Sequence, residues 1–436
     1  MNKTLFIISI LTTSLLNAAT VTLAPTKDNT LYESATGHLS NGAGQNFFVG
    51  KTRQSSGVSL RRAVIAFDIA GNIPAGAVIT DVELHLTMNK SRGNTQTVNL
   101  HTITSNWGEG TSDAGGNEGG GTLSTTNDAT WIHSFYDTVS WMTPGGDYLG
   151  TPSASLSISS QGEYTFQTNG MIGDVQGWLD TPAGNFGWIL LGDESTSATA
   201  QRFASREHPT VSSRPSLLIS YEIPQTTQLN PVKDNTLYET VDGSTSNGAG
   251  GNLFIGMTNG NAMRRAVLEF DVTSIHPQST IIDAQLDLEI TNTPSSPFIG
   301  TVNATLHSLS AEWGEAGSSG SGSGAGAQSG DATWLHRFFN TDLWTNPGGD
   351  FTASESASAP FDESSSNIQF QSTTQLINDV TAWVQDVNNN HGWLIIGDEV
   401  NSGNARGVSS REGSSPPVLT IQYLLPPDLI FANGFE

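Results

Sequence analysis

The sequence contains no cysteine and little positive charge. Without cysteine the chain can form neither a disulfide bond nor a lipid-modified N-terminal cysteine. Its 17 Lys and Arg are outnumbered by 41 Asp and Glu, which gives a formal net charge of −24. A field of that sign repels nucleic acid and anionic membranes, so we expect neither as a partner.

Long apolar runs are also missing, because none approaches the roughly 20 residues that a membrane-spanning helix needs. The run from Leu5 to Leu16 is apolar apart from a few Ser and Thr, follows Lys3 and precedes small residues that end at Ala19. This order is typical of an export signal, and we expect residues 1–19 to be a signal peptide. The sequence therefore predicts a secreted or cell-surface protein with no membrane span.

What the sequence does contain is β-strand patterning. Charged residues make up only 13% of the chain, and 47 of its residues are Gly. Between Val82 and Met88, apolar residues alternate with polar ones, and the strand-like stretch Arg61–Met88 has an echo at Arg264–Ile290. A period of two predicts half-buried β-strands, so the chain is expected to form β-rich globular domains.

The echo belongs to a tandem duplication. The string Lys-Asp-Asn-Thr-Leu-Tyr-Glu at Lys27 returns at Lys233 (233 − 27 = 206), and Trp-Gly-Glu at Trp107 returns at Trp313 (313 − 107 = 206). Such a period is far longer than that of solenoid repeats and indicates two complete domains. We expect a first copy at residues 20–224, a second copy at 225–426, and a C-terminal tail at 427–436.

Within each copy, many short strand-like runs are separated by Gly and Pro turns. One stretch, with Ile172, Val175 and Leu179, has helical spacing. The Gly- and Ser-rich segments 110–126 and 316–330 are expected to be flexible loops with nothing to bury. The predicted fold class is all-β: two tandem antiparallel β-sandwich domains, jelly-roll-like, each with at most one short helix.

The order of four motifs supports a family resemblance. Asp-Asn-Thr-Leu-Tyr-Glu, Arg-Arg-Ala-Val-x-x-Phe-Asp, Trp-Gly-Glu-Gly and Arg-Phe-Ala-Ser-Arg-Glu follow one another in the first copy. This order resembles the DNRLRE-domain family, which is related to disaggregatase-type repeats and to an alginate-binding carbohydrate-binding module. The resemblance covers both copies and implies an extracellular β-sandwich. The second copy has Gly407-Val-Ser-Ser-Arg-Glu412 in place of the last motif, so its ligand site is expected to differ.

Tryptophan supplies the candidate ligand site, because all ten Trp fall into five matched pairs. Three pairs flank the glycine-rich loop and a Pro-Gly-Gly-Asp turn, where solvent-facing rings are expected to stack on sugars while Asp, Asn and Arg bind hydroxyls. The alternative is that the rings are core and the Asp side chains stabilise the turn. The predicted ligand-binding residues are Trp107, Trp131, His133, Trp141 and Asp147, with Trp313, Trp334, His336, Trp344 and Asp350.

Acidic residues in loops suggest calcium as a possible ion, because Ca²⁺ prefers hard oxygen ligands. No spaced calcium-loop motif is present, so ordinary capping and turn carboxylates are the alternative. No cofactor is otherwise required. The predicted calcium ligands are Asp28, Asn29, Glu33, Asp193 and Glu194, with Asp234, Asn235, Glu239, Asp398 and Glu399.

Catalysis has weak support in the sequence. Asp128 lies five positions before His133, but no nucleophile elbow, paired-His metal motif or phosphate loop accompanies them. We therefore predict a non-catalytic extracellular protein that binds polysaccharide or matrix. The alternatives are a structural or adhesion spacer and a polysaccharide-active enzyme. The net charge opposes attraction to an acidic polysaccharide unless Arg side chains or bridging Ca²⁺ overcome it. Oligomeric state is not predicted.

Overall fold

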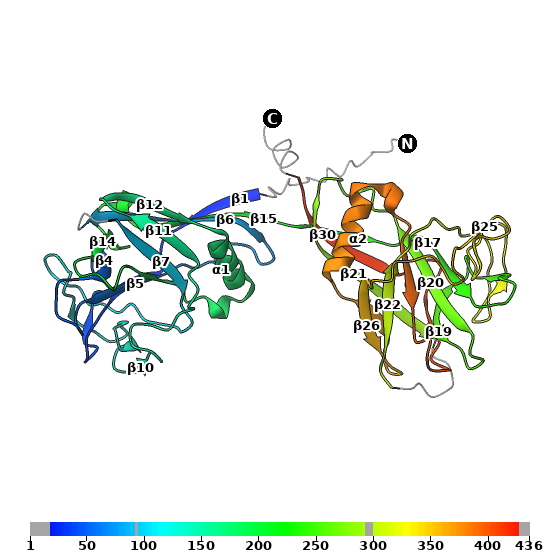
Figure 1. The fold of residues 1–436 in the computed structure, drawn as a ribbon, viewed down its shortest axis with the longest axis horizontal. Coiled ribbons are helices and arrows are strands. Elements are labelled where there is room, and N and C mark those ends of the chain that lie inside the picture. Colours follow the sequence, from blue (N-terminus) through cyan, green and yellow to red (C-terminus); the bar gives the residue numbers. More distant parts are fainter. Residues whose placement is uncertain (1–17, 92–94, 293–299, 427–436) are drawn as a thin grey trace, which may run out of the picture. The chain divides into compact units, whose positions relative to one another are not determined.

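The computed structural model describes residues 18–91, 95–292 and 300–426. The chain divides after Ile223 into two compact units that repeat one order of elements (Figure 1). This division lies one residue before the expected joint. Most of the expected signal peptide and the whole tail lie outside the described residues, whereas Ala18 and Ala19 begin the first strand.

The first copy contains one α-helix, α1 (Asn169–Asp180), and two 3₁₀ turns at Pro182–Gly184 and Val211–Ser213. Its strands are β1 (Ala18–Leu23), β2 (Lys27–Tyr32), β3 (Leu39–Ser40), β4 (Asn46–Lys51), β5 (Leu60–Ala66), β6 (Val78–Lys90), β7 (Gln96–Thr102), β8 (Thr122–Leu123), β9 (His133–Phe135), β10 (Val139–Ser140), β11 (Ala154–Ile158), β12 (Gly162–Gln167), β13 (Trp188–Leu191), β14 (Gln201–Ala204) and β15 (Ser216–Glu222).

The second copy likewise contains one α-helix, α2 (Thr374–Gln385), followed by a 3₁₀ turn at Val387–Asn389. Its strands are β16 (Gln225–Leu229), β17 (Pro231–Tyr238), β18 (Thr245–Ser246), β19 (Asn252–Met257), β20 (Met263–Phe270), β21 (Thr280–Asn292), β22 (Val302–Ser308), β23 (Ala325–Gly326), β24 (His336–Phe338), β25 (Asp342–Leu343), β26 (Ala357–Phe361), β27 (Asn367–Phe370), β28 (Trp393–Ile396), β29 (Arg406–Ser409) and β30 (Val418–Leu424).

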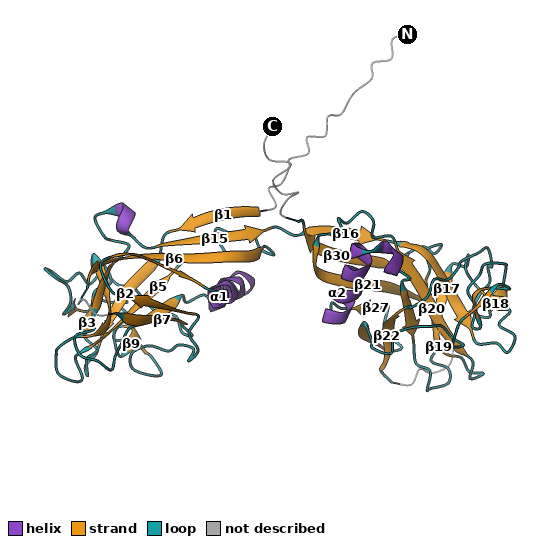
Figure 2. Ribbon diagram, turned by 45° about the horizontal axis from the view of Figure 1, so that its top comes forward, coloured by secondary structure: helices purple, strands orange, loops and turns teal. Residues whose placement is uncertain are grey.

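The main strands of each copy form one continuous antiparallel sheet of 11 strands that folds into two layers. In the first copy one layer has the order β1-β15-β6-β14-β4, with β12 also on β6, and the other has β5-β13-β7-β11, with β2 on β5; the short pairs β3-β8 and β9-β10 lie apart from it. Strand β4 pairs with β14 in the first layer and with β5 in the second, so it joins the two. The second copy repeats this order, and the fold prediction of two antiparallel β-sandwiches is confirmed (Figure 2).

The core lies where the alternating strands turn their apolar faces inward. In β6 the buried positions include Val82, Leu84, Leu86 and Met88, as the period of two predicted. The helix covers an open part of this core with Met171, Val175, Trp178 and Leu179. Its N-terminus is capped by the Thr168 hydroxyl, which accepts a hydrogen bond from the Met171 N–H and so satisfies a free donor.

A second apolar layer covers the far side of the β5-β13-β7 sheet. It is built from sheet residues such as Val64 and Ile189 together with Trp107, Trp131 and Trp141 of the long connection between β7 and β11. The glycine-rich segment in that connection contains buried side chains, which corrects the expectation that it has nothing to bury. Its Glu118 is 7% exposed, and Glu118 Oε2 accepts hydrogen bonds from the N–H of Asn46 (2.8 Å) and the Asn41 amide (3.1 Å).

Among the described residues, neither α1 nor α2 is long and apolar enough to cross a membrane.

Candidate functional site

The tryptophans expected to face solvent are buried. Trp107 and Trp313 are each 1% exposed, and the most exposed of the six, Trp131, reaches 9%. The indole N–H of Trp107 donates to the Phe186 carbonyl (2.8 Å), and that of Trp141 donates to the Thr130 carbonyl (2.9 Å). The prediction of a stacking platform at Trp107, Trp131, Trp141, Trp313, Trp334 and Trp344 is therefore wrong, because these rings pack the second apolar layer.

Four of these rings, Trp107, Trp131, Trp313 and Trp334, also carry one of the protein's own cations on a face. Lys27 Nζ lies 4.2 Å from the centre of the Trp107 ring, and the Arg62 guanidinium lies 4.9 Å from that of Trp131. Arg62 also makes a bidentate ion pair with Glu194, at 2.7 and 2.9 Å. A sugar ring has no access to an indole face that a guanidinium occupies.

The other predicted ligand residues hold turns in place. Asp147 accepts hydrogen bonds from the N–H groups of Met142 and Thr143, both at 2.9 Å, and Asp350 accepts equivalent bonds in the second copy. The His133 ring lies 3.2 Å from the Thr130 hydroxyl, and His336 repeats the contact with Thr333. These are the roles that the turn-stabilising alternative assigned to the two Asp.

The arrangement of Asp128 and His133 considered for catalysis is not formed. Asp128 accepts instead from Ser112 and from the Thr125 N–H and hydroxyl. The carboxylate is therefore used to close the loop and does not orient the imidazole.

The predicted calcium ligands do not converge. Asn29 uses its side-chain oxygen to accept from the Thr30 and Asn41 N–H groups, and Glu33 accepts from the Ser59 and Leu60 N–H groups. Asp193 accepts from the N–H groups of the turn that follows it.

The second copy shows the same separation of the predicted ligands. There the side chains of Asn235, Glu239 and Asp398 accept hydrogen bonds from backbone N–H groups of nearby turns and strands. Glu399 pairs with Arg265. The predicted site formed from these sets is therefore wrong. Only Asp28 and its counterpart Asp234 lie beside other carboxyl groups.

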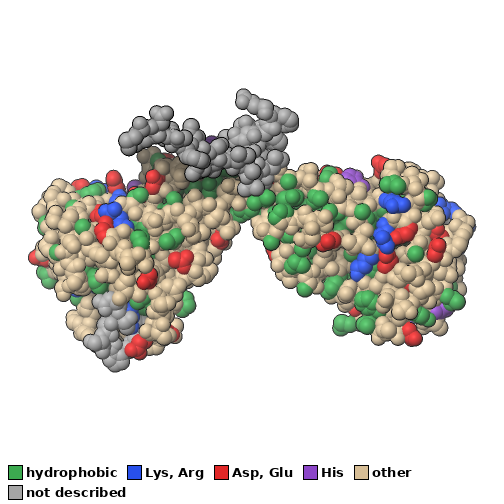
Figure 3. All heavy atoms as spheres, turned by 180° about the vertical axis from the view of Figure 1, so that it is seen from behind, with side chains coloured by type: hydrophobic (Ala, Val, Ile, Leu, Met, Phe, Trp, Pro, Cys, Tyr) green, Lys and Arg blue, Asp and Glu red, His purple; other side chains and the backbone are tan. Residues whose placement is uncertain are grey.

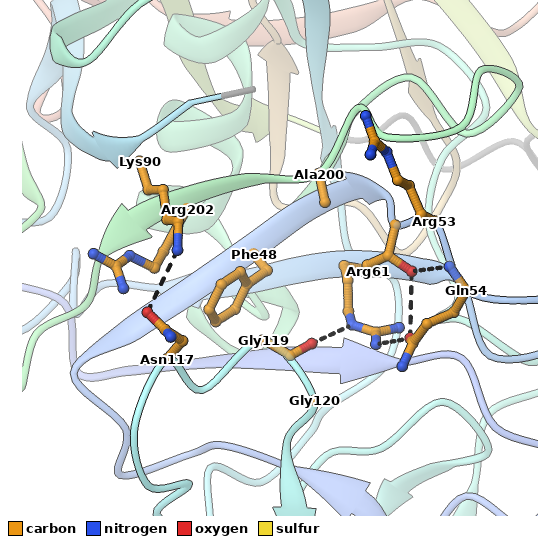
Figure 4. A pocket seen from close by; sticks show the side chains of 11 residues that line it. Phe48, Arg53, Gln54, Arg61, Lys90, Asn117, Gly119, Gly120, Ala200 and Arg202 are labelled. Carbon is orange, nitrogen blue, oxygen red and sulfur yellow. Dashed lines mark hydrogen bonds between the residues drawn. The ribbon is translucent and has the colours of Figure 1, made fainter. Parts of the chain in front are cut away.

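A cleft of about 450 Å³ in the first copy is lined by different residues. Phe48 of β4, which is 7% exposed, forms its apolar floor. Lys90, Asn117 and Arg202 lie on one side of this ring, and Arg53, Gln54 and Arg61 lie on the other (Figure 4). A cleft of this size falls in the range that small-molecule ligands occupy, about 300 to 1,000 Å³.

The pairing of β14 with β4 and β6 positions the residues on one side of the cleft. Arg202 of β14 lies directly across from Phe48 on one neighbouring strand and from Lys90 on the other. Cross-strand partners project to the same face of a sheet, so Arg202 and Lys90 lie on the same face as the Phe48 ring and on one side of it. Arg202 is held by Asn89, whose side-chain oxygen accepts from Arg202 Nε at 2.7 Å.

The other side of the cleft is built around Arg61. This side chain is 2% exposed and lies on Tyr32, with its guanidinium carbon 4.8 Å from the ring centre. Its Nε donates to the Gly119 carbonyl (3.1 Å) and its Nη2 donates to Gln54 Oε1 (2.9 Å). Burial lowers the pKa of Arg61 from its ordinary value. These bonds join the glycine-rich loop to the cleft and hold Gln54 at its rim.

The cleft gathers positive charge in an acidic protein. It holds four of the chain's 17 Lys and Arg, namely Arg53, Arg61, Lys90 and Arg202. Within the described ranges none of the four has a carboxylate within 4.0 Å, in contrast to Arg62 and Arg206. Charged groups elsewhere form small scattered clusters on a mostly uncharged surface, as the face in Figure 3 shows. The cleft is therefore a local concentration of positive charge in the described chain.

The second copy keeps the floor of this cleft and loses most of its charge. Phe254 and Arg264 repeat Phe48 and Arg61, and the Arg264 guanidinium lies 4.7 Å from the centre of the Tyr238 ring. The position of Arg202 is taken by Gly407, which lies across from Phe254. Asn292, across from Gly407, takes the place of Lys90, and Asn259 takes that of Arg53. Three of the four positive charges are thus absent.

No single stretch of the sequence marks this cleft, because its residues come from β4, β5, β6, β14 and three loops. The one signal was the replacement of Arg-Phe-Ala-Ser-Arg-Glu by Gly-Val-Ser-Ser-Arg-Glu, which includes the change from Arg202 to Gly407. The expectation that the two copies differ at a ligand site rested on that string.

No protein-family model and no curated protein sequence matches the chain. Among solved structures, the N-terminal CBM22-1-CBM22-2 tandem domain of Xyn10C from Paenibacillus barcinonensis is similar over 87% of this chain and 90% of that one, at 7% identity and a TM-score of 0.21. Allantoicase from Saccharomyces cerevisiae covers 83% of this chain and 80% of its own, at 10% identity and a TM-score of 0.16. The function is therefore inferred from the chain's own geometry.

Proposed function

We propose that this chain is a non-catalytic extracellular protein that binds a carboxylate-bearing polysaccharide in the cleft of its first copy. The observation that supports it is the set of Arg53, Lys90 and Arg202 around Phe48, none of which is neutralised by a carboxylate of the described chain. Arg61 adds its charge but is buried and donates to carbonyls of the chain. Guanidinium groups donate paired hydrogen bonds that match the geometry of a carboxylate. This proposal agrees with the DNRLRE resemblance of the sequence.

The net charge of −24 does not oppose such binding at short range. Charges separated by more than about 8 to 10 Å are largely screened at physiological salt, so the charges that line the cleft dominate there. Raising the salt concentration should weaken the binding, because the cleft is open to solvent.

The lining residues favour binding over catalysis. The residues around the cleft are basic, amide, hydroxyl, apolar and glycine residues, with no Asp, Glu or His among them. A glycosidase needs a pair of carboxyl groups across the bond that it breaks. Asn117 and Gln54 instead offer amides that can hydrogen-bond sugar hydroxyls. Because these bonds replace bonds to water, we expect weak affinity, in the high-micromolar range.

The test is calorimetric titration of the full chain with a polyuronate, a sulfated polysaccharide and a neutral glucan. We expect the polyuronate to bind and the neutral glucan to bind far less. The variant Arg53→Ala with Arg202→Ala should weaken polyuronate binding about hundredfold or more, because two charge-assisted hydrogen bonds of about 1.5 to 3 kcal/mol each are lost and every 1.4 kcal/mol is about a factor of ten.

A matched control removes the same charge elsewhere. Arg214 and Arg337 lie outside the cleft, where Arg214 donates to the His208 carbonyl and Arg337 lies 3.7 Å from Asp342. Arg214→Ala with Arg337→Ala should leave the affinity unchanged. An equal loss in this control, or equal binding of neutral and anionic polymers, would contradict the proposal. Binding to none of a broad set of glycans would favour the spacer or adhesion alternative.

A further inference from the structure

The solvent-facing cations of the cleft stand on two sides of Phe48. On one side, Lys90 of β6 and Arg202 of β14 lie in a row with Phe48 of β4, because the three strands are neighbours and Arg202 pairs with both other residues. On the other side, Arg53 lies in the loop that follows β4 (Figure 4). A ligand in the cleft therefore meets positive charge at two separate places.

A shift in strand pairing turns Lys90 toward the cleft. Arg202 lies across from Lys90, and the next residue of β14, Phe203, lies across from Met88, so Asn89 is an extra residue in β6. Residues two apart in a strand normally share a face, yet Met88 is buried in the core whereas Lys90 lines the cleft. An extra residue of this kind re-aims the side chain that follows it.

The two sides are too far apart for one carboxylate to bind both. Neighbouring strands are about 4.8 Å apart, so the backbone of Lys90 lies about 10 Å from that of Phe48. Figure 4 shows the guanidinium groups of Arg202 and Arg53 toward opposite ends of the cleft, with the Phe48 ring between them. A charge-assisted hydrogen bond to a carboxylate spans only about 2.7 to 2.9 Å. One carboxylate is therefore bound on one side at a time.

The cations on both sides have donors to spare. Arg202 uses its Nε to bind Asn89 Oδ1 at 2.7 Å, and Lys90 Nζ makes a long hydrogen bond of 3.4 Å to Asn117 Oδ1. Arg53 is exposed at the rim. Because Arg carries five N–H donors and Lys carries three, most of these donors are available to a ligand.

Between the two sides, the glycine-rich loop leaves room above the Phe48 ring. A Cβ atom added at Gly119 would lie 3.7 Å from Cε1 of this ring, and one added at Gly120 would meet nothing within 4 Å. Longer side chains at these positions would narrow the cleft. An apolar floor suits the C–H face of a sugar ring, whereas a carboxylate placed there would lose its water without gaining a hydrogen bond.

We propose, on the basis of the proposed function, that the cleft binds one uronate chain across Phe48 and reads two of its carboxylates at once. One carboxylate binds Arg202 and Lys90, a carboxylate of another residue of the same chain binds Arg53, and a sugar ring between them lies on Phe48. The ligand class is therefore a chain with carboxylates on at least two residues of the bound segment. Arg53 and Arg202 determine this specificity, each at its own end of the cleft.

The test is calorimetric titration of the full chain with a uronate trisaccharide and with the same trisaccharide after all but one of its carboxyl groups have been reduced to alcohols. The two ligands have the same length and differ only in the number of carboxylates. We expect the full trisaccharide to bind about tenfold more tightly or better, because the second charge-assisted contact is lost in the other ligand. The single uronic acid should bind no better than the reduced trisaccharide.

Variants remove the two sides separately. Arg53→Ala, and Lys90→Ala with Arg202→Ala, should each abolish most of the advantage of the full trisaccharide over the reduced one, whereas Arg214→Ala, outside the cleft, should keep it. A general loss of folding would weaken both ligands alike and leave their ratio unchanged.

Three results would overturn the inference. Equal affinity of the full and reduced trisaccharides in wild type, with polyuronate still bound, refutes the two-sided site and leaves the proposed function intact. An advantage that survives in both sets of variants refutes the assignment to Arg53 and Arg202. Absence of binding to any polyuronate refutes the proposed function and this inference together.

Discussion

The two copies use the same scaffold and differ in one cleft. Both copies bury their matched tryptophans, and both place an Arg on a Trp ring, Arg62 on Trp131 and Arg265 on Trp334. In both copies an Arg also pairs with neighbouring Glu side chains. Around Phe48 the first copy gathers four cations, whereas around Phe254 only Arg264 remains at the matching positions. Of these residues, those that both copies retain are the ones that packing requires, and those that differ line the cleft that we propose as the ligand site.

The largest expected effect tests the shared scaffold. Trp141→Ala and Trp344→Ala should each lower the free energy of unfolding of their own copy by about 3 to 5 kcal/mol, because a buried ring and its hydrogen bond to a carbonyl are lost. Calorimetric melting should show one transition shifted and the other unchanged. An unchanged melt in either variant would place that ring in solvent after all.

A smaller effect is expected when the cleft is transferred to the second copy. Asn259→Arg with Gly407→Arg restores two of the missing cations around Phe254. Two sites on one chain can engage one long polymer together, and linkage raises avidity by roughly 10² or more. Titration with long and short polyuronate chains should show the gain only for the long ones. Equal affinity of this variant and wild type for long chains would show that Phe254 does not lie in an equivalent cleft.

The smallest effect concerns the dependence of stability on pH. The pKa of Glu207 is about 7 in the fold against an ordinary 4.5, so the folded state holds a proton that the unfolded state releases between those values. Stability of the first copy should therefore fall as pH rises from about 4.5 to about 7. Arg206, Glu109 and Asp28 face this group, and the pKa of Asp28 is raised in the same direction.

Melting temperatures recorded across this pH range would measure the fall in the stability of the first copy. Glu207→Gln should flatten the dependence of the first copy, while the second copy, with Asp234 buried in the same way, keeps its own. A first copy whose stability rises with pH in the same window would contradict the burial of Glu207.

Local pattern was enough to predict much of the fold. The alternation in Val82–Met88 marks the face of β6 that is buried, and the spacing of Ile172, Val175 and Leu179 marks α1. Strand β14 was not predicted, because Gln201–Ala204 shows neither an alternation of polar and apolar residues nor an apolar run, and the pairing that makes it a strand comes from β4 and β6.

The site was predicted less well, because it depends on long-range packing. A position beside a glycine-rich loop suggested that Trp107 and Trp131 face solvent, yet sequence cannot show that this connection folds back over a sheet as a second apolar layer. Arg53, Lys90 and Arg202 come together only through the pairing of β4 with β14 and of β14 with β6.

The pairing of the first strand with the last strand in each copy has a mechanical consequence. Ala18 lies across from Glu222 and Leu23 across from Leu217, so the chain enters and leaves the copy at the same end of one antiparallel pair. Tension on the two ends of the copy therefore acts in an unzipping geometry, in which the hydrogen bonds between β1 and β15 break one after another. It does not act in a shear geometry, in which all of them would bear the force together. Strands β16 and β30 repeat this arrangement, with Gln225 across from Tyr423. When a polymer-bound chain is stretched, each copy should therefore begin to unfold at low force, starting with its terminal strands.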